Sequence, residues 1–317
     1  MSAIFADAGL VWLLALTLAL LVAASVIGLV LSQRVRTERG RATVSNMNAR
    51  IVSWWVLCSL MALALAFGDI AVIALFAIFS LLALREFTTL TPTHRGDHRT
   101  LFWSFFAFTP LQYLLVWSRW YGMFSILIPV YAFLYIPTRT AVAGDSEHFL
   151  ERTAKIHWGL MVCTYCFSHA PALLVLTIPG YAGQNAKLLF YFLLVVELSD
   201  VMQYVWGKLL GKRPIVPRIS PGKTWEGFIG GILSATAIGT ALWWATPFQP
   251  WQAAAMSLVT TLMGFAGGLT MSAIKRERGV KDYGTIIVGH GGVLDRIDAL
   301  CFSAPVFFHL TRYFFSV

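Results

Sequence analysis

Residues 8–32 read AGLVWLLALTLALLVAASVIGLVLS, an unbroken run of positions without a charged side chain. A helix needs about 20 predominantly apolar residues to cross the hydrocarbon core of a bilayer. The run is longer than the apolar core of a secretory signal peptide, and no basic residue precedes it. We therefore expect a retained membrane span at this position.

The rest of the chain repeats this pattern. Its 317 residues are 58% hydrophobic and only 12% charged, against roughly 25% charged in a typical soluble protein. Ten stretches are candidate spans: 8–32, 51–68, 69–84, 100–117, 122–137, 158–178, 188–206, 228–246, 252–274 and 299–317. The sequence predicts an all-α fold, a polytopic transmembrane helix bundle of about ten spans, in which residues 1–187 and 188–317 form one integrated bundle.

The positions of Lys and Arg predict which side each loop faces. If the N-terminus lies outside, five loops are cytoplasmic and hold 21 of the 24 basic residues: 33–50, 85–99, 138–157, 207–227 and 275–298. Only Arg119, Lys187 and Arg312 fall elsewhere. We expect an integral protein of a bacterial inner (cytoplasmic) membrane. Orientation alone explains the first three loops, whereas the last two contain more than topology requires.

The net charge of +9 raises the question of a nucleic-acid partner. The basic residues are spread over short loops between apolar runs and form no single basic domain. Anionic lipid headgroups and phosphate substrates are therefore the expected partners, and nucleic acid is not.

The four cysteines all lie in apolar runs. Cys163 and Cys166 form a CxxC pair, but no second pair or histidine cluster completes a zinc site. We interpret them as packing residues.

The first informative segment runs from Glu197 to Gly227. Glu197 and Asp200 are three positions apart and share one helix face at the end of a span, where carboxylates face a polar cavity or bind a cation. A pair of interfacial charges is the alternative. Farther on, residues 220–227 read SPGKTWEG, a turn followed by a helix start. Ser220, Lys223 and Thr224 suit an anionic ligand at a helix N-terminus.

The second informative segment runs from Ser272 to Asp298. Lys275, Arg276 and Lys281 offer phosphate contacts, and a glycine cluster at 289–292 lets the backbone approach a ligand. Asp295 and Asp298 lie at i and i+3 where the last span begins, so they face one way. Two carboxylates beside a basic loop can hold Mg²⁺ and leave its other positions for substrate phosphates.

These residue types suit transfer between two phosphates. When the nucleophile is already a phosphate oxygen, the barrier is repulsion between anions and the charge that develops on pyrophosphate. Metal ions and Lys or Arg lower that barrier by neutralisation and positioning. The sequence contains no serine-elbow, HExxH or dinucleotide-binding motif.

The stretch from Ser272 to Asp298 resembles the signature of the phosphatidate cytidylyltransferases (CDP-diacylglycerol synthases). That signature is S-x-hydrophobic-K-R, four residues, K-D, then H-G-G and D-R-x-D, and its spacing matches here throughout. The segments 200–204 and 220–227 resemble a second region of that family. The clear resemblance covers roughly residues 195–300.

The resemblance implies transfer of CMP from CTP to phosphatidic acid, with release of pyrophosphate. It implies Mg²⁺, with an added monovalent cation left open, a multi-helix membrane fold, and often a homodimer. It carries over catalytic roles to Asp295, Lys281 and His290. Metal ligation is expected of Asp295, Asp298, Asp282, Asp200 and Glu197. Substrate binding is expected of Ser220, Lys223, Thr224, Ser272, Lys275, Arg276, Gly291, Gly292 and Arg296.

The sequence also departs from the family pattern. Gly268 stands where the family has an Asp that serves as a metal ligand, and Val288 stands in place of a Pro. Glu197 replaces an apolar residue, which suggests that it supplies the carboxylate that Gly268 lacks. Two alternatives stay open: a divergent nucleotidyltransferase for another lipid phosphate, and a catalytically inactive membrane scaffold.

Overall fold

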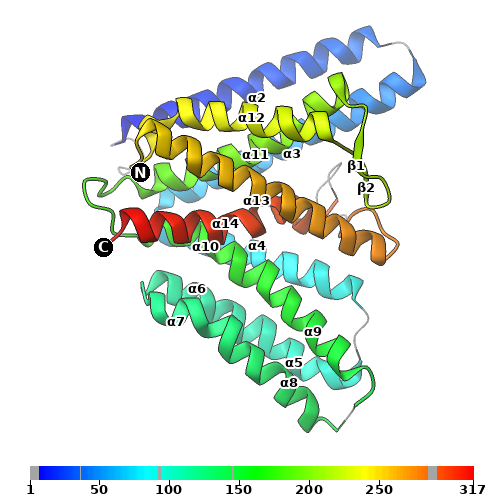
Figure 1. Cartoon of the computed structure of the whole chain (residues 1–317), viewed down its shortest axis with the longest axis vertical. Coiled ribbons are helices and arrows are strands. Elements are labelled where there is room, and N and C mark those ends of the chain that lie inside the picture. Colours follow the sequence, from blue (N-terminus) through cyan, green and yellow to red (C-terminus); the bar gives the residue numbers. More distant parts are fainter. Residues whose placement is uncertain (1–6, 36, 92–93, 145, 285–290) are drawn as a thin grey trace.

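The computed structural model describes residues 7–35, 37–91, 94–144, 146–284 and 291–317. Most of these residues are helical (Figure 1). The first half contains α2 (Ala8–Arg34), α3 (Glu38–Phe67), α4 (Asp69–Leu90), α5 (His98–Trp103), α6 (Thr109–Trp117), α7 (Tyr121–Ile126), α8 (Phe133–Val142), α9 (Phe149–Leu160) and α10 (Phe167–Ala172). The second half contains α11 (Asn185–Leu210), β1 (Pro214–Val216), β2 (Ser220–Thr224), α12 (Trp225–Ala241), α13 (Pro250–Glu277) and α14 (Leu294–Phe315).

Three of the long helices contain a π-helical segment. These segments are Ser104–Phe108 between α5 and α6, Leu127–Ala132 between α7 and α8, and Met161–Cys166 between α9 and α10. In the first, the Thr109 hydroxyl donates to the Ser104 carbonyl five residues earlier, at 2.9 Å, which matches the wider turn.

Each of the ten predicted spans overlaps a helical segment, so the polytopic all-α bundle is confirmed. Eight helical segments in the described part are long and apolar enough to cross a membrane. The two others are α12 and α14. Helix α12 has 17 residues and rises roughly 26 Å, and α14 carries three charges in its first five residues. A count of ten spans stays a prediction.

Two loop predictions are wrong in detail. Most of the predicted loop 33–50 is helical, because α3 begins at Glu38 with Thr37 as its N-cap. The Thr37 hydroxyl accepts the Gly40 N–H at 3.3 Å, and a polar face does not prevent a helix outside the bilayer. Residues 220–224, predicted as a turn, form β2, which pairs antiparallel with β1 in a short hairpin. The hairpin is a local addition to an otherwise helical fold.

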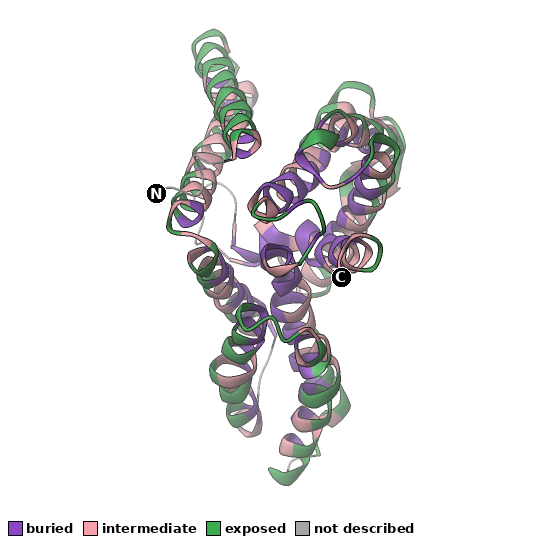
Figure 2. Ribbon diagram, turned by 90° about the vertical axis from the view of Figure 1, so that its left-hand side faces the viewer, coloured by how far each residue is buried: buried purple, intermediate pink, exposed green. Residues whose placement is uncertain are grey.

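The core lies where helices from both halves of the chain cross. Helix α14 packs against α13, α10 and α4, and α11 packs against α12 and α13. Figure 2 shows buried residues in the middle of the molecule and exposed residues on the outlying helices. Large apolar side chains are exposed along those outer helices, for example Leu29 in α2 and Phe106 near α6. Such surfaces are stable in contact with lipid chains.

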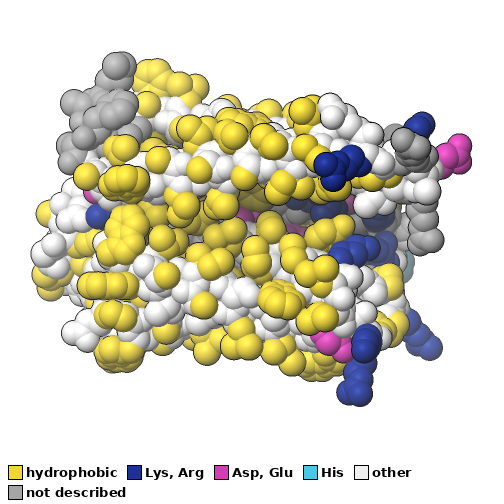
Figure 3. Space-filling model, turned by 90° about the horizontal axis from the view of Figure 1, so that it is seen from above, with side chains coloured by type: hydrophobic (Ala, Val, Ile, Leu, Met, Phe, Trp, Pro, Cys, Tyr) yellow, Lys and Arg dark blue, Asp and Glu magenta, His cyan; other side chains and the backbone are white. Residues whose placement is uncertain are grey.

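Charged side chains gather at one end of the bundle. In Figure 3, Lys and Arg lie mainly at the right-hand end, and the flank between the ends is hydrophobic. The β-hairpin occupies that same end in Figure 1. The molecule is therefore an integral membrane protein with one basic end, and the assignment of that end to the cytoplasm stays a prediction.

Candidate functional site

The two informative segments meet at the basic end of the bundle. Helix α11 carries Glu197 and Asp200, α13 carries Lys275, and α14 carries Asp295 and Asp298. The contacts of α13 with α14 and of α11 with both bring these helices together. Residues separated by about a hundred positions in the sequence thus form one cluster.

Asp295 organises this cluster through three contacts. One carboxylate oxygen accepts a hydrogen bond from the Lys275 ammonium at 2.8 Å. The other accepts the backbone N–H groups of Tyr283 at 2.7 Å and Gly292 at 2.9 Å. The Asp295 side chain is only 3% exposed. Its carboxylate therefore holds the chain that enters α14, and the catalytic and metal roles expected of it from the sequence stay predictions.

Glu86 holds the same segment from the other side. This residue of α4 is buried, and its carboxylate accepts the N–H of Val293 at 2.9 Å and that of Leu294 at 2.8 Å. These are free N–H groups at the start of α14, which a carboxylate stabilises both by hydrogen bonding and through the helix dipole. Helix α4 thus supplies the N-terminal anchor of α14.

Sequence reasoning missed Glu86, because loop 85–99 was interpreted as a matter of orientation alone. That interpretation is wrong for this residue. The signal was present: Glu86 is an acidic residue at the end of an apolar run, as Glu197 and Asp200 are. The structure adds a partner two hundred positions away.

Glycines allow the carboxylates of Glu86 and Asp295 to come close to the backbone of the chain before α14. A Cβ atom on Gly292 would overlap Glu86 Oε2, and one on Gly284 would lie 2.7 Å from Glu86 Oε1. Gly291 has φ +81°, and a Cβ there would lie 2.7 Å from Asp295 Oδ2. The absence of a side chain at these three glycines therefore lets two carboxylates reach the backbone, and the substrate contact expected of Gly291 and Gly292 stays a prediction.

The carboxylates of Glu197, Asp200 and Asp298 lie near enough to one another for their charges to interact. The charges of Asp200, Arg296 and Asp298 act on Glu197, and the charge of Lys223 acts on Asp200 and Asp298. One Asp298 oxygen lies 3.9 Å from the Lys275 nitrogen. Within the described part of the chain, neither Glu197 nor Asp200 has a side-chain hydrogen bond, which leaves these oxygens available.

This group suits one kind of metal site and not another. The described residues contain no set of three or more His, Cys, Asp or Glu side chains placed to enclose a metal ion. Mg²⁺ is usually held by one or two carboxylates, with water and substrate phosphates as the other ligands. Asp200 and Asp298 fit that second pattern, with Glu197 beside them.

Lys223, of the β-hairpin, lies against Gly268 of α13. Its ammonium nitrogen is 3.1 Å from where a Cβ atom on Gly268 would stand. The same nitrogen lies over the Phe265 ring, 4.6 Å from its centroid. The positive charge of Lys223 thus lies beside Gly268 of α13, the helix that packs against α14, which carries Asp298.

The hairpin that carries Lys223 is held by backbone contacts. The Arg276 guanidinium donates to the carbonyls of Ile219 and Val280, each at 3.0 Å, so this side chain links α13 to the hairpin. The Glu226 carboxylate accepts the N–H groups of Lys212 at 3.0 Å and Arg213 at 3.2 Å. These hydrogen bonds hold the pKa of Glu226 below its usual range, and the one from Lys212 has the largest effect.

The remaining predicted residues fall into separate places. Thr224 is the N-cap of α12 and accepts the Gly227 N–H at 3.2 Å, and the Ser272 hydroxyl donates to the Gly268 carbonyl at 2.7 Å. Ser220 begins β2 and is partly exposed. Lys281 and Asp282 are exposed. His290 lies outside the described residues.

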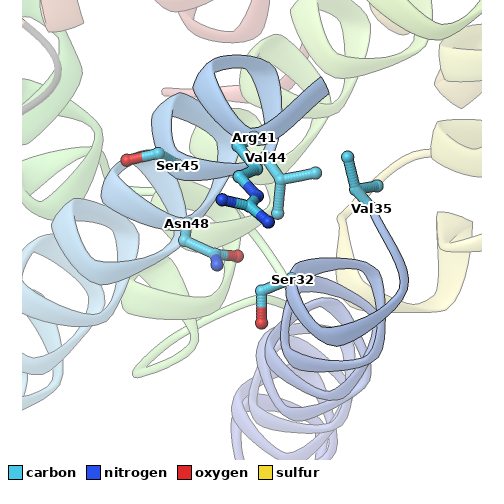
Figure 4. Close-up of a pocket in the computed structure, with 6 residues that line it drawn as sticks. All are labelled: Ser32, Val35, Arg41, Val44, Ser45 and Asn48. Atoms are coloured by element: carbon cyan, nitrogen blue, oxygen red, sulfur yellow. The ribbon is translucent and has the colours of Figure 1, made fainter. Parts of the chain in front are cut away.

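A pocket of about 250 Å³ lies apart from this cluster, between the end of α2 and the start of α3. Figure 4 shows Arg41, Asn48 and Ser32 pointing into the space between the two helices. The pocket contains no residue of the predicted site, and it adds no member to the cluster.

Comparison with known proteins identifies the family. A model of the cytidylyltransferase family matches residues 48–314. The chain is 38% identical over 304 residues to a protein of Escherichia coli (strain K12) named uncharacterized protein YnbB, covering 95% of this chain and 97% of that one. It is 39% identical over 171 residues to a phosphatidate cytidylyltransferase of Mycobacterium leprae (53% of each chain). It is 41% identical over 126 residues to one of Staphylococcus aureus (39% of this chain, 48% of that one). The chain therefore spans about half the length of the phosphatidate cytidylyltransferases that it matches. The protein belongs to the cytidylyltransferase family.

Proposed function

We propose that this protein transfers CMP from CTP to phosphatidic acid, giving CDP-diacylglycerol and pyrophosphate. The observation that carries the proposal is the grouping of Asp200 and Asp298 with Lys223 and Lys275 at the basic end of a membrane bundle. Similarity to proteins named phosphatidate cytidylyltransferase supports the choice of donor and acceptor. We assign the basic end to the cytoplasm, where CTP is available.

In the proposed reaction, an oxygen of the lipid phosphate attacks the α-phosphorus of CTP. The new P–O bond forms as the bond from that phosphorus to the oxygen bridging the α- and β-phosphates breaks. Pyrophosphate leaves with the bonding electron pair. The nucleophile is already an anion, so the chain needs no general base and must chiefly bring two anions together. Lys223 and Lys275 supply positive charge for this purpose.

Asp200 and Asp298 would hold Mg²⁺, with Glu197 as the third nearby carboxylate. The ion would neutralise charge on the nucleotide phosphates and on the departing pyrophosphate. Asp295 would act indirectly, because its contacts with Lys275 and with two backbone N–H groups fix the lysine and the glycine segment. The glycine segment would then present backbone N–H groups to a phosphate.

The test is an assay of purified full-length protein with α-labelled CTP, phosphatidic acid and Mg²⁺. We expect label in the lipid fraction, and its loss in Asp298→Asn. Asp298 is preferred to Asp295 because substitution of Asp295 would also remove the hydrogen bonds that hold the chain before α14. Glu277→Gln is the matched control, since this carboxylate lies on α13 with its side chain 67% exposed. Absence of lipid-linked label with any lipid phosphate would contradict the proposal.

Gly268 favours testing a second acceptor. The Lys223 ammonium lies beside Gly268, and we infer that the substrate phosphates would meet a lysine where the resemblance implies an aspartate. A related nucleotidyltransferase with another lipid phosphate would show transfer only when that lipid replaces phosphatidic acid. A membrane scaffold without activity would show no transfer, and its cellular phenotype would survive Asp298→Asn. Glu197→Gln with unchanged Mg²⁺ dependence would exclude Glu197 as a substitute ligand.

A further inference from the structure

Three basic residues lie outside the basic loops: Arg119, Lys187 and Arg312. A basic residue on the non-cytoplasmic side opposes the usual charge bias, so it needs a local reason. Lys187 has one, because its ammonium lies 3.3 Å from Asp7 Oδ2 and donates to Gln184 Oε1 at 2.6 Å. The two arginines require a different explanation.

Arg119 and Arg312 line the same pocket. It has a volume of about 150 Å³ and lies between the turn after α6, the chain beyond α10 and the end of α14. Arg119 is exposed in that turn, where its φ of 60° is left-handed. The Arg312 guanidinium is half-buried and stacks on the Tyr121 ring, 3.7 Å from its centroid. Two side chains far apart in sequence thus converge on one cavity.

Neither guanidinium forms an ion pair within the described part of the chain. No carboxylate there lies within 4.0 Å of Arg119 or Arg312, and neither side chain makes a hydrogen bond to the described residues. Asp69, at the start of α4, is near enough for the Arg119 charge to act on it but forms no ion pair with it. Guanidinium groups bind phosphate oxygens through several N–H donors at once. The pocket is complementary to a phosphate anion.

The surroundings of the pocket favour a lipid as the source of that phosphate. Its walls include the apolar side chains of Val116, Leu176 and Phe308. Trp117, Trp120 and Tyr313 are exposed on the adjoining surface. Exposed Trp and Tyr side chains mark the level of the lipid headgroups. A free phosphate would leave the apolar walls unused, whereas a phospholipid would use both parts.

We propose that this pocket binds the headgroup phosphate of an anionic glycerophospholipid from the leaflet opposite the proposed active site. Arg119 and Arg312 hold the phosphate, and the apolar wall contacts the glycerol and the first acyl carbons. The site is separate from the carboxylate cluster, which lies at the other end of the bundle. It holds a lipid that is not a substrate.

The experiment measures lipid retained by the full-length protein during detergent purification, by native mass spectrometry. The probe is phosphatidylglycerol, because phosphatidic acid would also enter the proposed active site. We expect wild type to retain one more phosphatidylglycerol than Arg119→Gln/Arg312→Gln, and apparent affinity in the double variant to fall at least about tenfold. The matched control is Arg50→Gln, since Arg50 of α3 also lies over a tyrosine ring, that of Tyr204 in α11.

Three results would overturn the proposal. The first is equal retention of phosphatidylglycerol by wild type and the double variant. The second is that wild type retains phosphatidylcholine as well as it retains phosphatidylglycerol. The third is displacement of phosphatidylglycerol by inorganic phosphate at a similar concentration. The last would assign the pocket to a free anion. CMP transfer in phosphatidylcholine micelles is measured in parallel and should be unchanged, so failure of this proposal and of the proposed activity remain distinguishable.

Discussion

The Lys223 ammonium lies 3.1 Å from the point that a Cβ atom on Gly268 would occupy. Lys223 belongs to the hairpin before α12 and Gly268 to α13, so the relationship links the first informative segment to the helix that leads into the second. Because Lys223 lies near enough for its charge to act on Asp200 and Asp298, we interpret the lysine as a counter-charge for this carboxylate group.

Removal of that counter-charge should make the protein depend more on Mg²⁺ for stability. In Lys223→Met, repulsion between Asp200 and Asp298 is less compensated, so we expect a lower Tm without Mg²⁺ and a larger rise in Tm when it is added. Thermal unfolding of detergent-purified protein, with and without Mg²⁺, measures both quantities. Lys212→Met is the control, since Lys212 is exposed on the same segment. Equal Mg²⁺ shifts in the two variants would contradict the counter-charge role.

Substitution at Gly268 tests the same contact from the other side. Gly268→Asp places a carboxylate beside the Lys223 ammonium, whereas Gly268→Asn has nearly the same size without the charge. We expect Asp to be tolerated better than Asn by about 1 kcal/mol, the upper end of the range for a solvent-exposed ion pair. In the Lys223→Met background this preference should disappear. A preference that persists without Lys223 would place the partner of the new carboxylate elsewhere.

Loss of the Glu86 carboxylate should destabilise the start of α14. In Glu86→Ala the N–H groups of Val293 and Leu294 lose their acceptor, and a buried unpaired donor costs about 1–3 kcal/mol. Glu86→Gln retains one acceptor oxygen and should lose less. Hydrogen exchange at the N–H groups of Val293 and Leu294 should accelerate in the order wild type, Gln, Ala. Unchanged exchange at these two positions in Glu86→Ala would show that the anchor has no energetic role.

Gly292→Ala should perturb the same anchor without changing any charge. The new Cβ would overlap Glu86 Oε2, so the carboxylate or the backbone must move. We expect a loss of stability of about 1–3 kcal/mol, as for overpacking in a core, measured by thermal or denaturant unfolding. Gly122→Ala is the matched control, because a Cβ there meets no atom within 4 Å. Equal stability of the two variants would contradict the close approach.

The hairpin should weaken at acid pH through Glu226. Its folded-state pKa is lowered by the N–H groups of Lys212 and Arg213, so its contribution is complete above the ordinary glutamate value of about 4.3. The contribution declines below that value and is lost as the pH falls through the folded-state pKa. The stability difference between wild type and Glu226→Gln should therefore vanish in acid. Glu277→Gln, measured over the same pH range, should show no comparable change.

The bundle was predictable because a bilayer imposes a strong rule on sequence. Backbone groups in hydrocarbon must be paired within the segment, so long uncharged runs become helices wherever they occur. Helix ends were less predictable. The segment from Glu38 to Arg50 is polar, and hydropathy cannot distinguish a polar helix from a loop, whereas the N-cap at Thr37 decides it.

The candidate site was predictable in its residue types and only in part in its contacts. The spacing of Asp295 and Asp298 placed both near the start of α14, as observed. Their different environments did not follow from spacing. Asp295 is turned toward Lys275 and the glycine segment, whereas one Asp298 oxygen remains 3.9 Å from the same lysine.

The sequence by itself determined a multi-span helical membrane protein and the basic end of the bundle, and it predicted phosphate and metal chemistry for two segments. These follow from local composition and from motif spacing, which act within a few turns of helix. Only the tertiary structure decided that Glu86 caps α14, that Lys223 lies beside Gly268, and that Arg119 and Arg312 share a pocket. Each of these pairs joins distant segments, because helix packing rather than sequence separation sets which side chains meet.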